Sequence, residues 1–178
     1  MKRLLIALTL AAAACAPAES PPPPTAKVQE GAVQDEVAEL WMADTRTVLT
    51  GDAALTLTRQ CSRISPAPVE DTWTPSAADI AALEGELILL VARKLEEAGQ
   101  SPSPGDYYRQ YAGFTIGGRR IIYVNGVAGS AIRMTNPNHP FDWRTQATQI
   151  CDGGTITFGV EYDPATGQFS NFAFNGSV

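Results

Sequence analysis

Hydrophobic side chains recur with the period of an α-helix in two segments of the chain. The shorter segment spans residues 28–45, and its apolar positions fall on one stripe of an amphipathic helix: Val33, Val37, Leu40 and Trp41. The longer segment predicts a helix from Pro75 to about Ala98, which Gly99 ends. Its apolar face consists of Ile80, Leu83, Leu87, Leu90, Val91 and Leu95.

Two N-terminal caps fit the longer helix, and its polar face follows from the same period. Thr74 can cap the helix with Pro75 at the first helical position, or Ser76 can form a capping box with Asp79. The side chains that we expect to face water are Glu84, Arg93, Glu96 and Glu97.

The second half of the chain changes to the period of two that is typical of β-strands. Residues 108–116 and 119–127 form two such runs. The Gly117-Gly118 link between them suits the positive φ angles of a two-residue hairpin. Residues 121–124 are apolar on both faces, which indicates a central strand.

Two further strands are predicted over residues 155–162 and 168–174, on either side of a turn at residues 163–167. Four strands with short links favour an antiparallel meander, which the longer helix would cover on one face. The predicted fold class is therefore α+β: one long helix on a four-stranded antiparallel meander, with a short N-terminal helix and an extended segment.

The chain between the two helical segments is less regular. Residues 45–49 are expected to be extended. Residues 54–59, in which Leu and Thr alternate over 55–58, are expected to be extended as well, although residues 52–55 can equally start a helical turn. Residues 65–75 contain three prolines and are expected to form a loop.

Length and composition fit one globular domain, predicted over residues 28–178. The chain has 178 residues, of which 44% are hydrophobic and 18% charged, so a single core is expected. The formal net charge is −6, and a single Arg-Arg pair at residues 119–120 makes no basic tract. Nucleic acid is therefore excluded as an expected partner, because phosphate binding needs clustered positive charge.

The first fifteen residues carry an export signal. Lys2 and Arg3 precede an apolar run over residues 4–14, which is too short to span a membrane and fits a signal peptide. The run ends Ala12-Ala13-Ala14 directly before Cys15, and here the sequence resembles bacterial lipoprotein precursors, although Ala12 stands where Leu is commoner. The alternative is cleavage after the Ala-Pro-Ala of residues 16–18, which would release a soluble protein without Cys15.

The resemblance implies that residues 1–14 are removed and that Cys15 receives fatty acyl chains such as palmitate. The protein would then be held by lipid at the cell membrane or the outer membrane, facing the periplasm or the cell exterior. Ala16 after the acylated cysteine agrees with sorting to the outer membrane. Residues 15–27 are rich in proline and favour an extended tether of about 35–40 Å between the lipid and the domain.

The two remaining cysteines, Cys61 and Cys151, are an even pair in an exported chain, so a disulfide is expected. Free buried thiols and a reactive thiol are the alternatives. A small hydrolase or thiol enzyme would use Cys151 with His139 and Asp152. No cofactor or metal is expected, because the chain has one histidine and lacks the glycine-rich phosphate-binding motifs and the calcium-loop pattern.

Aromatic side chains outside the predicted core are the best candidates for a partner surface, because Tyr and Trp are enriched where proteins bind each other. The alternative is that they pack the ends of the sheet. The candidate surface comprises Tyr107, Tyr108, Arg119, His139, Phe141 and Trp143. The face of the sheet without the helix is a second candidate and includes Thr157.

The leading hypothesis is a non-enzymatic, lipid-anchored protein of the cell envelope whose domain binds an envelope protein or a glycan. The thiol enzyme described above is the first alternative, and a purely structural lipoprotein is the second. The anchor, the stiff tether and the paired cysteines favour the leading hypothesis over both.

Overall fold

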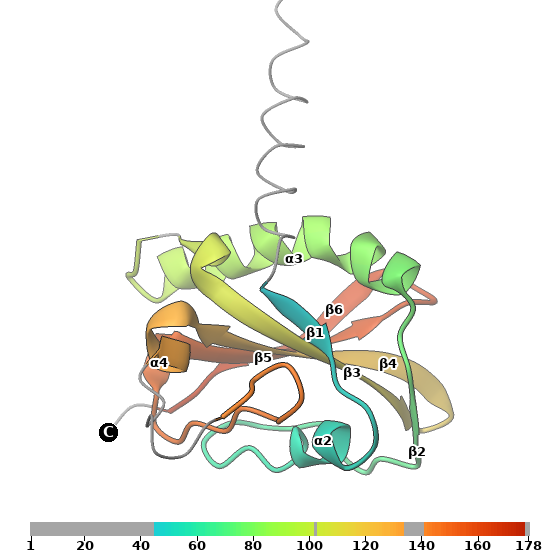
Figure 1. Cartoon of the computed structure of the whole chain (residues 1–178). Helices are drawn as coiled ribbons and strands as arrows, with labels where there is room; N and C mark the ends of the chain where they lie inside the picture. Colours follow the sequence, from blue (N-terminus) through green and yellow to red (C-terminus); the bar gives the residue numbers. More distant parts are fainter. Residues whose placement is uncertain (1–44, 102, 134–140, 177–178) are drawn as a thin grey trace, which may run out of the picture.

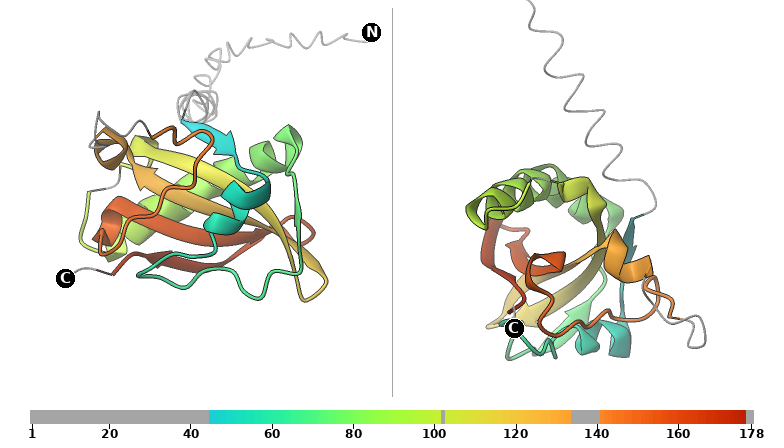
Figure 2. Two further views of the ribbon diagram at one scale, coloured as in Figure 1. Left: turned by 60° about the horizontal axis from the view of Figure 1, so that its bottom comes forward. Right: turned by 90° about the vertical axis from the view of Figure 1, so that its left-hand side faces the viewer.

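The computed structural model describes residues 45–101, 103–133 and 141–176, and these residues form three layers. The long helix α3 (Ala77–Glu97) lies across one face of a twisted sheet, and the short helix α2 (Gly51–Thr56) lies on the opposite side (Figures 1 and 2). The helix predicted over residues 28–45 lies outside the described residues, apart from Thr45. The predicted α+β class is confirmed, since helices and a sheet make up the described chain.

Among the described residues the sheet has six strands rather than the predicted four, and it is mixed rather than antiparallel throughout. Its four longer strands pair antiparallel in sequence order: β3 (Tyr107–Ile116), β4 (Arg119–Ala128), β5 (Thr157–Asp163) and β6 (Gln168–Phe174). Two short strands share the other edge of β3, β1 (Arg46–Val48) parallel to it and β2 (Asp71–Trp73) antiparallel. Strand β2 falls inside the segment predicted as a loop. Strand β1 lies within residues 45–49, which were expected to be extended, whereas β2 was not predicted, because three residues are too few to show a period of two.

The link between β3 and β4 is the predicted two-residue hairpin. Gly117 has a φ angle of 57° and Gly118 one of 71°, so both residues are in the region that glycine adopts without steric cost. The carboxylate of Glu70 accepts hydrogen bonds from both of their backbone N–H groups, at 2.9 and 3.1 Å. The segment that precedes β2 thereby holds the turn.

Helix α3 begins at the second of the two predicted caps. The Ser76 hydroxyl accepts a hydrogen bond from the Asp79 N–H at 3.2 Å, and the Asp79 carboxylate accepts one from the Ser76 N–H at 2.8 Å. The Ser76 hydroxyl also donates to the Asp79 carboxylate at 2.7 Å, and this hydrogen bond first and the one from the Ser76 N–H second lower the pKa of Asp79. The helix ends at Glu97, and Gly99 follows with a φ angle of 70°.

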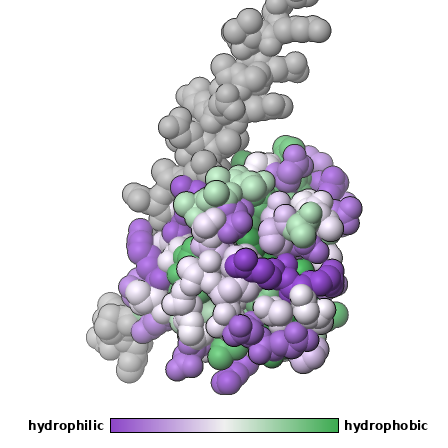
Figure 3. Space-filling view, turned by 90° about the vertical axis from the view of Figure 1, so that its right-hand side faces the viewer, coloured by the Kyte–Doolittle hydropathy of each residue, from purple (hydrophilic) through white to green (hydrophobic). Residues whose placement is uncertain are grey.

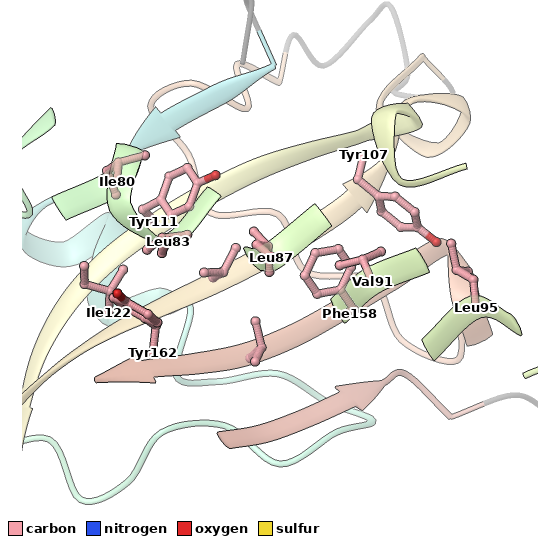
Figure 4. Close-up of a cluster of buried hydrophobic side chains, with 12 residues drawn as sticks. Ile80, Leu83, Leu87, Val91, Leu95, Tyr107, Tyr111, Ile122, Phe158 and Tyr162 are labelled. Carbon is pink, nitrogen blue, oxygen red and sulfur yellow. The ribbon is translucent and has the colours of Figure 1, made fainter. Parts of the chain in front are cut away.

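The main hydrophobic core lies between α3 and the sheet. The predicted apolar stripe of α3 packs onto alternate residues of β3, β4 and β5, and Figure 4 shows these side chains meeting between the helix and the strands. Two aromatic pairs join strands across this core, Tyr107 with Phe158 and Tyr162 with Phe169. The buried members of the cluster are Ile80, Leu83, Leu87, Val91, Leu95, Tyr107, Tyr111, Ile122, Val124, Phe158, Val160 and Tyr162.

Glu84 is a correction to the predicted polar face of this helix. Its side chain is 1% exposed, whereas Glu96 and Glu97 are exposed as predicted. The position lies four residues after Ile80 and three before Leu87, so the helical period places it within the apolar stripe. A partner on β3, described below, makes its burial possible.

The opposite face of the sheet is covered, so it is not the open surface that the sequence suggested. Residues 51–56 form α2, which shows that the extended conformation predicted for residues 54–59 is wrong and that the helical turn is right. Thr157 on this face is 1% exposed. A second core cluster joins α2 and its flanks to β3 and β4, and it comprises Leu49, Ala54, Leu57, Ala112, Phe114 and Tyr123.

Irregular chain completes this third layer and is tied to the sheet by polar groups. The Asn125 amide donates to Gln110 Oε1 at 2.9 Å and to the Thr148 carbonyl at 3.0 Å. The Arg63 guanidinium donates to the side-chain oxygens of Asn125 and Asn175. A disulfide joins Cys61 to Cys151 across the same layer. The short helical turns are η1 (Pro104–Asp106), α4 (Gly129–Arg133) and η2 (Gly154–Ile156).

Candidate functional site

The structure brings part of the predicted aromatic surface together at one end of the sheet. Tyr107 and Trp143 are 5% and 6% exposed, so burial removes both of them from the candidate surface. Tyr108 is half-buried, with its ring edge-to-face on Trp143 at 4.9 Å between centroids. Phe141 is half-buried as well, in a depression that it shares with Ile132 and the segment 147–150. His139 lies outside the described residues.

Arg119 lies at the other end of the sheet, in the first position of β4 after the hairpin. Its guanidinium is exposed and reaches the Asp163 carboxylate at 3.5 Å. Figure 3 views the molecule from the side to which this hairpin points in Figure 1, and hydrophilic and hydrophobic side chains are interspersed there. The structure therefore separates Arg119 from the aromatic residues with which it was grouped.

A polar pocket opens beside Tyr108, with a volume of about 320 Å³. The antiparallel register pairs Tyr107 with Ala128, which sets the start of β3 beside the end of β4 and the start of α4. The turn η1, begun by Pro104, places Asp106 directly before β3. The lining residues are Thr45, Gly105, Asp106, Tyr108, Ala128, Gly129 and Ser130.

Two buried aromatic residues adjoin Tyr108, Tyr107 as its neighbour on β3 and Trp143 through the contact of their rings. The Tyr107 hydroxyl donates to the Thr155 carbonyl, and burial first and the Asp106 carboxylate second raise the pKa of Tyr107 to about 12. The Trp143 carbonyl accepts a hydrogen bond from the Gln110 amide at 2.6 Å. Tyr108 therefore packs against the buried ring of Trp143, which is itself hydrogen-bonded to β3.

A buried ion pair lies next to this pocket and was not predicted. The Arg109 guanidinium donates to both carboxylate oxygens of Glu84, from Nε at 3.0 Å and from Nη2 at 2.8 Å. The Tyr111 hydroxyl hydrogen-bonds the same carboxylate, and burial and this negative charge raise the pKa of Tyr111 well above its usual value. Arg109 also donates to Thr45 Oγ1 at 3.0 Å, which links the ion pair to the wall of the pocket.

An apolar groove lies on the other side of Thr45, between the edge strand β1 and the start of α3. Its volume is about 480 Å³. Ile80 and Tyr111 lie beside each other on its inner side, as Figure 4 shows. The lining residues are Arg46, Thr47, Val48, Ala77, Ile80, Ala81 and Tyr111. The pocket and the groove are thus neighbours, since Thr45 lines the pocket while Arg46 and Thr47 line the groove.

The residues of the predicted thiol enzyme are engaged elsewhere or not described. Cys151 is joined to Cys61, and a disulfide sulfur is not the thiolate that attacks a substrate. Asp152 has a φ angle of 56° in the bend that follows. His139 is among the residues whose position is not described. Within the described parts of the chain, no three His, Cys, Asp or Glu side chains lie close enough to hold a metal ion.

Comparisons with known proteins add no family or relative. The chain matches no protein-family model, no curated protein and no solved structure. Among the described helices, none is both long enough and apolar enough to cross a membrane.

Proposed function

We propose that this protein is a lipid-anchored component of the cell envelope whose domain binds a glycan without catalysing a reaction. The N-terminal sequence supports the anchor: a positively charged start, an eleven-residue apolar run and Cys15 after small residues. A proline-rich segment follows and would hold the domain about 35–40 Å from the lipid. The anchor places the domain where envelope glycans are its neighbours.

The observation that carries the choice of ligand is the polar pocket beside Tyr108. Its walls offer the carboxylate of Asp106, the hydroxyls of Thr45 and Ser130, and an aromatic ring. Sugar hydroxyls hydrogen-bond to carboxylates and hydroxyls, and the apolar face of a sugar ring packs on an aromatic side chain. At about 320 Å³ the pocket is at the lower end of the range of roughly 300–1,000 Å³ that small-ligand sites occupy.

A protein partner is the competing class, and the geometry supports it less well. A stable protein interface covers about 800 Å² on each partner and is centred on buried aromatic anchors. Two of the four described aromatic residues that were candidates for such anchors at this end, Tyr107 and Trp143, are part of the domain's own interior. A concave polar site fits one or a few sugar rings better than it fits a flat protein surface.

The test of binding uses the protein extracted from its own membrane in neutral detergent and titrated with fragments of the envelope glycan. We expect Tyr108→Ala and Asp106→Asn each to weaken binding about tenfold, equivalent to roughly 1.4 kcal/mol. Arg119→Ala is the matched control, because Arg119 is exposed at the other end of the sheet, and it should leave binding unchanged. If all three variants bind the glycan as tightly as the unaltered protein does, the pocket is not the binding site.

The test of the anchor is the intact mass of the same preparation, alkylated with and without prior reduction. An acylated Cys15, with two further thiols that alkylate only after reduction, is the expected result. A mass that corresponds to a chain beginning after residue 18 would show that the protein is secreted without the lipid anchor. A Cys151 that alkylates without reduction would favour the thiol enzyme instead.

A further inference from the structure

The solvent side of α3 carries an apolar centre between two opposite charges. Leu89 is 62% exposed, and no other large apolar side chain of α3 is exposed. Leu90 follows it directly and is half-buried. Glu86 lies three positions before Leu89 and Arg93 lies three positions after Leu90, so the helical period places all four on neighbouring positions of one side of the helix.

These four side chains border a depression between α3 and the strand β6. Its volume is about 390 Å³, and Gln168 and Phe169 at the start of β6 form its other wall. Strand β6 is the last strand on this side of the sheet within the described ranges, and Figure 2 shows it beside α3. Leu90 and Phe169 are half-buried there, so part of their apolar surface stays in contact with water.

The two charges that flank the leucines are not used within the chain. Among the described residues, neither Glu86 nor Arg93 has a side-chain ion pair or hydrogen bond. They lie seven positions apart, which is about 10.5 Å along a helix axis and too far for an ion pair with each other. Each charge is therefore available to a partner of opposite sign on another molecule.

The order of these residues is complementary to itself. Read from either end, it gives a charge, two leucines and the opposite charge, with two positions between each charge and the nearer leucine. In a two-fold symmetric dimer the same patch occurs on both copies and every contact occurs twice. An axis that passes between Leu89 and Leu90 sets the leucines of the two copies against each other. It also sets each Glu86 opposite the Arg93 of the second copy.

The self-complementarity selects both the occupant and its orientation. Two parallel copies of the helix would oppose glutamate to glutamate and arginine to arginine, so only the antiparallel arrangement pairs unlike charges. A partner of unrelated sequence would have to present the same pattern in reverse, which this chain already carries.

We infer that this side of α3 is the contact surface of a homodimer, in which two copies of the helix pair antiparallel about Leu89 and Leu90. Leu89 of each copy packs at the depression of the other, which Leu90 and Phe169 line. The patch has six residues, against about 20–30 on each side of a stable interface, so the dimer belongs to the weak, reversible class. The inference stands apart from glycan binding, because its test uses no ligand.

The experiment is sedimentation equilibrium of the full processed protein in neutral detergent whose density is matched to the solvent. We expect a monomer–dimer equilibrium with a Kd between about 1 μM and 1 mM. Glu86→Arg places an arginine opposite Arg93 twice in the dimer and should raise the Kd at least about tenfold. Glu96→Arg is the matched control, because Glu96 is exposed on the same helix and does not border the depression, and it should leave the Kd unchanged.

Mixing two variants tests the pairing directly. Glu86→Arg and Arg93→Glu should each dissociate alone, but an equimolar mixture of the two should dimerise, because every facing pair is again of opposite sign. Circular dichroism reports whether each variant is folded, and Leu89→Gln, which should also raise the Kd about tenfold, tests the apolar centre without a change of charge. A chain that stays monomeric up to about 1 mM overturns the inference. A dimer that tolerates both single variants, or a mixture that fails to associate, overturns it as well.

Discussion

The two faces of the sheet are closed in different ways. One face is covered by a single regular element, α3, whose apolar stripe meets alternate residues of three strands. The other is covered by α2 and irregular chain, which contribute a smaller apolar cluster and a set of polar contacts. A helix satisfies its own backbone hydrogen bonds, so side chains alone decide how it packs.

Irregular chain has no such internal pairing, and the third layer shows the consequence. Gln110 on β3 donates to the carbonyls of Trp143 and Gln146, and its oxygen accepts from the Thr148 N–H at 2.9 Å. Asn125 on β4 reaches the Thr148 carbonyl. Side-chain amides of the central strands therefore replace the backbone partners that the segment 143–148 lacks, as buried backbone groups require.

The helical face has one polar exception, and it is ionic rather than neutral. Glu84 and Arg109 are both almost completely buried and hydrogen-bonded to each other. A buried ion pair contributes little net stability compared with well-packed apolar residues, but the loss of one partner leaves a charge in the core. The comparison therefore predicts that the stability of the helical face is most sensitive to the loss of one ion pair. The stability of the other face should depend on many weaker contacts.

The largest effect is expected from Arg109→Met. The substitution leaves the Glu84 carboxylate buried without its cation, which should lower the free energy of unfolding by about 3–5 kcal/mol. The measurement is urea denaturation followed by circular dichroism. Lys94→Met is the control, because Lys94 pairs with Glu97 at 2.6 Å on the surface, and its loss should cost about 0.5 kcal/mol or less.

The double variant Glu84→Leu with Arg109→Met sharpens this prediction. Replacing both partners removes the charge from the core, so most of the lost stability should return. A double variant as unstable as Arg109→Met alone would show that the ion pair itself, rather than the unpaired charge, holds α3 on the sheet.

The next effect concerns the irregular layer and its disulfide. Replacing Cys61 and Cys151 by alanine opens a link between positions 90 residues apart, which should cost about 2–5 kcal/mol. The loss should appear first as faster hydrogen exchange in the segment 141–153, with the α3 amides affected later. Simultaneous loosening of both layers would contradict the view that the two faces are closed independently.

Asn125→Ala is expected to have a smaller effect. It removes the donor to Gln110 and to the Thr148 carbonyl and leaves the Arg63 guanidinium with one acceptor fewer, which should cost about 1–3 kcal/mol. No second substitution should restore this stability in the way that Glu84→Leu restores Arg109→Met. Full recovery of stability when Gln110→Leu is added to Asn125→Ala would show that Asn125 and Gln110 act as a single pair rather than as part of a wider network.

The same contrast explains how much of the molecule the sequence predicted. The α3 stripe, the β3–β4 hairpin and the strands β5 and β6 each have a local period or a glycine link, and the structure contains all of them. The extended conformation of residues 45–49 was predicted, but the pairing of β1 with β3, the strand β2 and the elements that cover the second face depend on partners far along the chain, which no local pattern reveals. Thr157 was therefore placed on an open face that is in fact buried.

The candidate site was likewise predicted where the signal is local and missed where it depends on contacts between distant segments. The cluster of tyrosines before β3 drew attention to the right end of the sheet, but which ring stays accessible is decided by contacts with Trp143 and Thr155. The ion pair between Arg109 and Glu84 was not predicted, because each residue was assigned from the pattern of its own segment alone. The one available signal was a glutamate within an apolar helical stripe, since such a position needs a buried partner of opposite charge.

The smallest effect at pH 8 is expected from Tyr107→Phe. The substituted residue connects the two faces of the sheet. Tyr107 packs in the main core, yet its hydroxyl donates to the carbonyl of Thr155 in the segment that leads into β5. Loss of this hydrogen bond should lower the free energy of unfolding by about 0.5–1.5 kcal/mol at pH 8. The effect of the substitution should then change with pH in a defined direction.

Burial raises the pKa of Tyr107 to about 12, whereas an unfolded tyrosine ionises near pH 10. Between these values the unfolded chain has lost a proton that the folded chain retains, so stability falls as the pH rises, by at most about 1.4 kcal/mol per pH unit for one group. Tyr107→Phe should make this fall shallower, and the buried Tyr111 and Tyr123, whose pKa values are also raised, should account for the remaining slope. Urea denaturation of both proteins between pH 8 and pH 11 measures the difference. Equal slopes would mean that the hydroxyl of Tyr107 is open to solvent rather than buried against Thr155.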